Sequence, residues 1–307
     1  MPDEKNSTAQ APFNNPDCDI ILRSCDGVNF CVFKLILSLA SPMFKVMFTL
    51  PQTGLQSDDL SVPVIPVTET STTMKSLLLL CYPTANPTFN SLADAKGVLE
   101  AARKYDMGGT LSRTRDLIMA QFPSADPLEL YVLSCRFGWQ YYAQAAAART
   151  LEIKDLGIPK GECAGLRDIT GLDYQRLLIY HYNCGVAAQA VPRSLVWIKP
   201  EPSDMCMWTC TREAKRSPLN PSRSVFIKES RVTTSWFDEY IVSTRMELLA
   251  RPCESTLYES ESYDRAVGKA VTCSECLPNV VVHMAKFRSL IAAEVKKVVG
   301  NVRLNAD

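Results

Sequence analysis

Four cysteines in the second half of the chain have spacings that could bind a metal: Cys206 and Cys210 are separated by three residues, and Cys273 and Cys276 by two. Two close thiolate pairs that meet in a fold can complete a tetrahedral zinc site, in which four protein ligands leave no open position for a substrate. These four are therefore candidate ligands of a structural zinc ion. A His-x-x-Cys pair at residues 181–184 offers rival ligands. The alternative is that the cysteines are close by chance and are buried as small apolar side chains.

Few other residues suggest chemistry. The sequence has only two histidines, His181 and His283, each among apolar residues, and it has no Gly-x-Ser-x-Gly motif to expose a nucleophile. A redox role for Cys273 and Cys276 would need a strand before them and a helix directly after, whereas residues 262–271 are expected to be helical. Glycine-rich phosphate loops are absent. We therefore expect no enzyme activity and no small-molecule substrate, with a zinc-dependent or thiol enzyme as the remaining alternative.

Composition sets limits on the partners. Lys plus Arg and Asp plus Glu are balanced at 33 each, so no overall positive field attracts nucleic acid or an anionic membrane. Apolar residues make up 47% of the chain, as in a folded globular protein. The first residues lack the pattern of a secretory signal, and the longest strongly apolar stretch, residues 77–82, is too short to span a bilayer. We expect an intracellular protein, in the cytoplasm or nucleus, with reduced thiols.

The first third of the chain begins with a strand pattern. Residues 19–24 and 29–34 have the composition of strands, and Asp26 with Gly27 between them is typical of a hairpin turn. Residues 62–67 are expected to be extended. Their two prolines cannot donate hydrogen bonds to a neighbouring strand, so this strand should lie at the edge of the sheet.

Helices are expected between and after these strands. Residues 35–40 are apolar without alternation, and Ser41 with Pro42 forms the N-cap and first turn of a second helix. Residues 74–81 form a helix that Pro83 ends, because a proline disfavours helical geometry in the residue before it. Apolar residues at steps of three and four predict two more helices, over residues 94–107 and 111–122.

The order of these elements over residues 17–122 resembles the BTB/POZ domain, in the variety found in many small fungal proteins. The residues that carry the resemblance lie in the opening strand, the second strand with the first helix, the second helix, the end of the middle helix and the helix after it: Asp19; Phe30, Val32, Lys34 and Leu37; Ser41, Pro42, Phe44, Met47 and Phe48; Tyr82 and Pro83; and Tyr105. One departure is Phe33, where the family usually has histidine.

The resemblance implies a domain whose use is association, with itself as a dimer or with another protein, and not chemistry. Residues 126–138 and 143–151 look like the paired helices that often extend such domains in fungal proteins. In family members that bridge substrates to cullin ubiquitin ligases, such helices help to build the ligase-binding surface, so a ubiquitin-ligase adaptor is an alternative. The acidic residue that adaptors commonly show after the second helix is not evident in residues 48–52. Fungal relatives also often carry Cys and His pairs near the C-terminus, which supports the zinc site.

The sequence therefore predicts an α+β protein with no cofactor apart from zinc. We expect a disordered tail at 1–15, a BTB/POZ-like domain at 16–122, a helical extension at 123–190 and a mixed, mostly helical module at 191–307.

Three further expectations concern local structure. Phe44, Met47, Phe48 and Leu35 should carry the packing of the early helices. A basic segment around residues 215–223 should be a mobile, solvated loop. Near the C-terminus, an apolar stripe at steps of three and four should dock a long helix onto this protein's own domain; it comprises Met284, Phe287, Ile291, Val295, Val298 and Val302.

Overall fold

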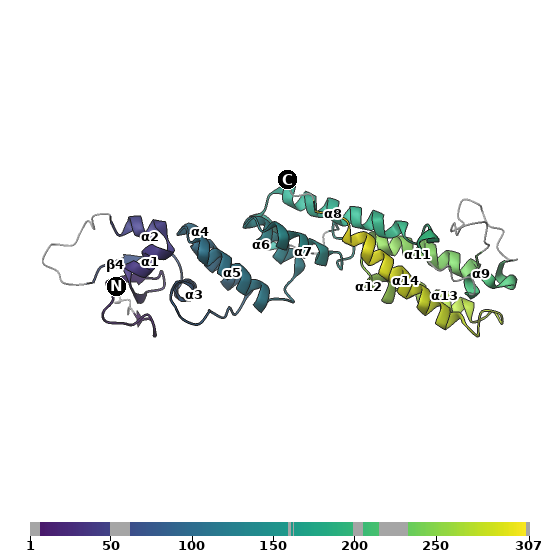
Figure 1. The fold of residues 1–307 in the computed structure, drawn as a ribbon, viewed down its shortest axis with the longest axis horizontal. Coiled ribbons are helices and arrows are strands. Elements are labelled where there is room, and N and C mark those ends of the chain that lie inside the picture. Colours follow the sequence, from purple (N-terminus) through teal and green to yellow (C-terminus); the bar gives the residue numbers. More distant parts are fainter. Residues whose placement is uncertain are drawn as a thin grey trace. The chain divides into compact units, whose positions relative to one another are not determined.

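The computed structural model describes residues 7–49, 62–158, 161, 163–198, 205–214 and 233–304, drawn in colour in Figure 1. The chain divides into two compact units, Met1–Ala125 and Asp126–Asp307, called here the N-terminal and C-terminal units. The N-terminal unit holds a small sheet with helices, and the described part of the C-terminal unit is mostly helical, so the expected α+β class is confirmed.

A four-stranded sheet organises the N-terminal unit. In the order in which they lie side by side, its strands are β1 (Ser7–Thr8), β3 (Val28–Val32), β2 (Ile20–Arg23) and β4 (Val64–Pro66). β2 and β3 form the predicted antiparallel hairpin, and Gly27 adopts a φ of 80° in its turn, a conformation that glycine tolerates at no steric cost. β4 pairs in parallel with β2 and lies at the edge, as its prolines predicted.

The expectation of a disordered tail is wrong for residues 7–15. β1 pairs in parallel with β3, and the Ala9 N–H donates to the Asn29 carbonyl at 2.8 Å. The ring of Phe13 is buried, with ring centroids 5.9 Å from Phe30 and 5.3 Å from Tyr82. Backbone pairing and one buried aromatic side chain therefore order a segment whose composition alone suggests a loose tail.

The helices described in the N-terminal unit are α1 (Lys34–Ala40), α2 (Pro42–Met47), α3 (Ser71–Cys81), α4 (Leu92–Lys104) and α5 (Gly108–Gln121). α1 packs against α2 and α3, and α4 contacts α3 and α5. α3 ends before Tyr82, whose extended backbone precedes Pro83 as expected.

The helices described in the C-terminal unit are α6 (Pro127–Arg136), α7 (Gln140–Thr150), η1 (Ala164–Asp168), α8 (Gly171–Ala190), η2 (Leu195–Trp197), α9 (Cys206–Thr209), α10 (Thr211–Ala214), α11 (Ser235–Ala250), α12 (Ser255–Tyr258), α13 (Glu261–Ala270) and α14 (Val280–Gly300). α6 and α7 form a pair, and α8 packs against α11 and α14, as Figure 1 shows. Gly185 permits the close approach of α8 to α11, because a Cβ at this position would lie 2.6 Å from the Leu249 carbonyl oxygen.

α14 docks onto the C-terminal unit, as its apolar stripe predicted. Met284, Phe287, Ile291 and Val295 are buried, and the Phe287 ring lies 5.1 Å from that of Phe237. At the end of the stripe the prediction was wrong, since Val299 is buried, Val298 is half-buried and Val302 lies beyond the helix. Val302 cannot extend the stripe, because α14 ends at Gly300.

The predicted division into a tail and three parts is not settled by this arrangement. The compact units meet between Ala125 and Asp126, close to the expected end of the BTB/POZ-like domain at residue 122. A boundary at residue 190 stays a prediction. α8 would end the predicted helical extension, and it packs against α11 and α14 of the predicted C-terminal module. The predicted mobile loop at 215–223 lies outside the described residues.

Candidate functional site

Two residues of the family pattern hold the start of α1. Phe33, the N-cap of α1, makes no side-chain cap, so the first backbone N–H groups of the helix need other partners. The Lys34 N–H donates to the Asp19 carboxylate at 2.7 Å, and the Phe33 N–H donates to the Tyr82 hydroxyl at 2.9 Å. Asp19 and Tyr82 therefore fix the junction between β3 and α1, at the position where the family usually has histidine.

A second group of these residues fixes α2. The Ser41 hydroxyl accepts the Phe44 N–H at 3.0 Å and donates to the Tyr105 carbonyl, so it joins the start of α2 to the end of α4. Pro42 occupies the first turn of α2. The buried Phe44 ring stacks on Tyr105 at 4.6 Å and on Phe48 at 5.7 Å. The other pattern residues pack beside them: Phe30, Val32 and Leu37 are buried, whereas Met47 and Phe48 are half-buried.

A charged network closes this part of the core. The Glu69 carboxylate accepts hydrogen bonds from Tyr105 Oη at 2.6 Å and from Lys104 Nζ at 2.7 Å. Burial alone would raise the pKa of Glu69, but these two hydrogen bonds outweigh it and hold the pKa below its usual value. Burial, together with the hydrogen bond to Glu69, raises the pKa of Tyr105. Glu69 belongs to none of the sequence patterns described above.

α1 and α2 also carry a cluster of exposed apolar side chains, which we call the α1/α2 apolar face. Its members are Leu35, Leu39, Met43 and Val46, with exposed fractions of 69%, 81%, 42% and 60%. The expectation that Leu35 carries the early packing is therefore wrong, because the buried side of α1 is the one with Leu37. Phe44 does carry it. Large exposed apolar side chains that lie together mark interaction surfaces more often than isolated ones do.

The structure brings three of the four predicted cysteines of the C-terminal unit together and places the fourth, Cys206, beside them. Cys206 begins α9 and Cys210 follows it, whereas Cys273 and Cys276 lie in the turns between α13 and α14. The sulfurs of Cys210, Cys273 and Cys276 lie within 4.8 Å of one another, and the Cys210 and Cys273 sulfurs are 3.6 Å apart. The Cys206 thiol interacts with that of Cys276, and all four side chains are buried.

Glu275, which sequence reasoning missed, ties the two cysteine segments together. Its carboxylate accepts the Thr211 N–H at 2.8 Å and the Thr211 hydroxyl at 3.0 Å, and Arg212 Nε lies 3.5 Å away. The hydrogen bond from the Thr211 N–H lowers the pKa of Glu275. The signal for this tether is an acidic residue between two cysteines, together with a Thr-Arg pair directly after Cys210.

The net pKa shift differs in direction between the thiols, although burial raises the pKa of each. The net pKa is raised for Cys206 and for Cys276. At Cys273 burial acts in the same direction, but the backbone N–H groups of Cys276 and Glu275 point at the sulfur and bring the net pKa below its usual value. The Cys206 N–H donates to His283 Nδ1 at 3.1 Å, so His283 borders the group as well.

The rival pair of ligands has other partners. His181 Nε2 lies 3.1 Å from the Ile153 carbonyl oxygen, and burial lowers its pKa. The Cys184 thiol interacts with Tyr180. Within the described residues, Cys210, Cys273 and Cys276 form the only group of three or more potential ligand side chains at this spacing.

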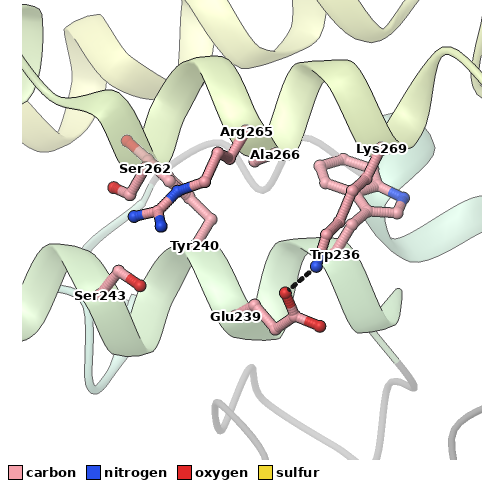
Figure 2. Close-up of a pocket in the computed structure, with 8 residues that line it drawn as sticks. All are labelled: Trp236, Glu239, Tyr240, Ser243, Ser262, Arg265, Ala266 and Lys269. Atoms are coloured by element: carbon pink, nitrogen blue, oxygen red, sulfur yellow. Dashed lines mark hydrogen bonds and ion pairs between the residues drawn. The ribbon is translucent and has the colours of Figure 1, made fainter.

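A small cavity lies between α11 and α13 (Figure 2). Buried Trp236 and Tyr240 line it, and an ion pair between Lys269 and Glu239 lies at one end. Its volume of about 130 Å³ is below the ~300–1,000 Å³ of ligand pockets. Its lining includes neither histidine nor cysteine, so we assign it no reaction.

Comparison with known proteins identifies the N-terminal unit. Within the described part of the chain, no helix is long and apolar enough to cross a membrane. No curated protein matches the chain. Residues 10–121, which contain the hairpin, the edge strand and α1 to α5, match the BTB/POZ domain family. The resemblance to the fungal variety stays a prediction. The chain therefore carries a BTB/POZ domain at its N-terminus, followed by a mostly helical remainder.

Proposed function

We propose that this protein acts by association through its BTB/POZ domain, and that the α1/α2 apolar face binds the same face of a second copy. BTB/POZ domains are protein-interaction modules. The observation that carries the proposal is the group of four large apolar side chains exposed on two adjacent helices: Leu35, Leu39, Met43 and Val46.

The chemistry of the face favours a second copy as the partner. Lys34 and Lys45 are the only charged residues of α1 and α2, so the face has no alternating charges to select a charged partner. An apolar face can pair with itself about a twofold axis, in which case each residue of the face contributes to the interface once from each copy. Of these two lysines only Lys45 is exposed, and it would lie at the solvated rim of such an interface.

The free energies of apolar burial and of association predict a measurable but reversible dimer. Burying a large apolar side chain stabilises by about 1.5–3 kcal/mol, and these four are already partly buried. Four such side chains from each copy therefore contribute on the order of 10 kcal/mol. Association costs about 4–15 kcal/mol in lost freedom of motion. The two terms are comparable, so the monomer and dimer should exchange with concentration.

Sedimentation equilibrium of the full chain over a hundredfold range of concentration tests this proposal. We expect a monomer–dimer equilibrium that Leu39→Glu shifts strongly towards the monomer, because the substitution places two carboxylates in the interface. Val282→Glu is the matched control, since Val282 is a similarly exposed apolar residue on α14 in the other unit. A native chain that is monomeric throughout, or a Leu39→Glu variant that still dimerises, contradicts the proposal.

Two alternatives remain open to experiment. A substrate adaptor for a ubiquitin ligase would co-purify with a cullin. A zinc-dependent or thiol enzyme would hold a metal with an open coordination position, or would lose a measurable rate on thiol blockade.

A further inference from the structure

The spacing of the sulfur atoms in the C-terminal unit points to a common ligand. Cys210 and Cys273 have sulfurs 3.6 Å apart, and both lie within 4.8 Å of the Cys276 sulfur. Zinc–sulfur bonds of about 2.3 Å in a tetrahedron place the sulfurs about 3.8 Å apart. A disulfide would need about 2 Å. We propose that Cys206, Cys210, Cys273 and Cys276 bind one zinc ion, which joins the α9 segment to the turns between α13 and α14.

Cys206 is the fourth ligand in this proposal. It begins the single turn of α9 and lies four residues before Cys210, a spacing that places two residues on neighbouring turns of a helix. Its thiol already interacts with Cys276 but is not part of the 4.8 Å group, so a side-chain rotation would have to bring it closer to the ion. His283 is the less suitable ligand, because its Nδ1 accepts the Cys206 N–H.

The surroundings suit four thiolates around a divalent cation. Such a site carries a net negative charge, which hydrogen-bond donors in the surrounding shell must offset. The backbone N–H groups of Glu275 and Cys276 point at the Cys273 sulfur, and the Arg212 guanidinium lies near Glu275. Four protein ligands leave no open position, so the ion would stabilise the fold and would not activate water.

The ion would act on a segment that cannot fold alone. α9 and α10 are four residues each, whereas isolated helices shorter than about 12–15 residues are marginal in water. Trp208 packs its ring 5.3 Å from that of Phe237, and the Glu275 tether adds a polar link. Zinc would hold the same segment, residues 206–214, through its cysteine sulfurs. Its removal should therefore open residues 206–214 locally and leave the N-terminal unit unchanged.

Metal analysis of the full chain, purified under reducing conditions without chelator, is the first test. We expect one zinc per chain, and one tetrahedral cobalt with thiolate charge-transfer bands after exchange. Cys210→Ser and Cys276→Ser should each lose the metal. Cys184→Ser is the control, since Cys184 is equally buried in the same unit but belongs to another pair, and it should keep the metal. A chain purified without metal that binds neither zinc nor cobalt when supplied, or one that holds iron, overturns the proposal.

Two further measurements complete the test. The first uses the native chain, so it does not depend on variants that fold, and the second identifies the fourth ligand. In the native chain, a chelator should make the four thiols accessible to alkylation, as located by mass spectrometry, and should speed amide exchange over 206–214. No change on chelation contradicts the site. Cys206→Ser should weaken zinc affinity at least tenfold, and an unchanged affinity would show that the fourth ligand is another group. None of these results depends on dimerisation through the BTB/POZ domain.

Discussion

The two units anchor their short elements in different ways. In the N-terminal unit, α1 and α2 are seven and six residues long, and hydrogen-bonding side chains hold their starts: Asp19 and Tyr82 at α1, and the N-cap Ser41 at α2. In the C-terminal unit, α9 and α10 are held beside a group of thiols and one carboxylate, that of Glu275. The first kind of anchoring uses ordinary hydrogen bonds and should be insensitive to metals and oxidants. The second depends on groups that respond to both.

The units also differ in the hydrogen bonding of their buried polar side chains. Among the described residues, all buried side-chain nitrogen and oxygen atoms without a hydrogen-bond partner lie in the C-terminal unit, including the Tyr240 hydroxyl and the Trp236 indole nitrogen. Each such group costs about 1–3 kcal/mol. In the N-terminal unit, buried Ser41 and Thr114 have partners. Unpaired buried polar atoms therefore oppose the folding of the core around α11.

The largest effect should follow from loss of Phe44 in the N-terminal unit. Phe44→Ala removes a buried ring stacked on Tyr105 and should destabilise this unit by about 3–5 kcal/mol. Hydrogen exchange on the full chain, resolved by peptide, should show faster exchange over the sheet and α1 to α5 only. Lys75→Ala, at an exposed position of α3 outside the α1/α2 apolar face, is the control and should change little. Equal acceleration over residues 126–304 would show that the two units unfold together.

A smaller effect in the C-terminal unit should come from the contact of α8 with α11. Gly185→Ala places a Cβ 2.6 Å from the Leu249 carbonyl oxygen and should cost about 1–3 kcal/mol through overpacking. Gly268→Ala on α13 has open space around the new Cβ and should stabilise by up to about 1 kcal/mol. Urea denaturation of both variants measures the difference. If the two substitutions change the free energy of unfolding in the same direction, α8 does not pack as closely on α11 as described.

The network around Glu69 makes a pH-dependent contribution to the N-terminal unit. Because the pKa of Glu69 is lowered in the folded state, its stabilisation is present above the ordinary value of 4.5 and is lost as the pH falls through the folded pKa. Glu69→Gln should cost about 1 kcal/mol at pH 7, since the amide keeps only part of the hydrogen bonding to Lys104 and Tyr105. Denaturation curves of the variant and the native chain should converge on acidification below pH 4.5. If the difference in unfolding free energy between the two proteins does not change with pH, the charge of Glu69 does not contribute to stability.

Local signals predicted much of the N-terminal fold. Asp26 with Gly27 marked the hairpin, Ser41 with Pro42 marked the start of α2, and Pro83 marked the end of α3, because each acts through its own backbone geometry. The inward side of α1 was not predictable. Five of its seven residues are apolar, so no separate apolar stripe is visible in so short a helix, and the burial of Leu37, not periodicity, shows that Leu35 faces outward.

The cysteine group was only partly predictable for a similar reason. Spacing identified the four candidates, but their convergence depends on contacts between residues 63 positions apart, such as Cys210 and Cys273. Parallel pairing of β1 with β3 likewise depends on a strand elsewhere in the chain. Glu275 was missed because its position between two cysteines does not identify a partner, and the contact with Thr211 joins residues far apart in the sequence.

The smallest effect should come from Glu275→Gln, which tests whether the thiols and the tether act separately. The substitution removes the charge that Thr211 and Arg212 face but leaves all four cysteines in place. We expect zinc content to be unchanged and amide exchange over 206–214 to rise a few-fold, because an exposed polar link is weaker than a metal–thiolate bond. Asp264→Asn, an acidic residue exposed on α13, is the matched control. Loss of metal in Glu275→Gln would instead make this carboxylate part of the binding site, and the C-terminal unit would then rely on one combined anchor where the N-terminal unit has several independent ones.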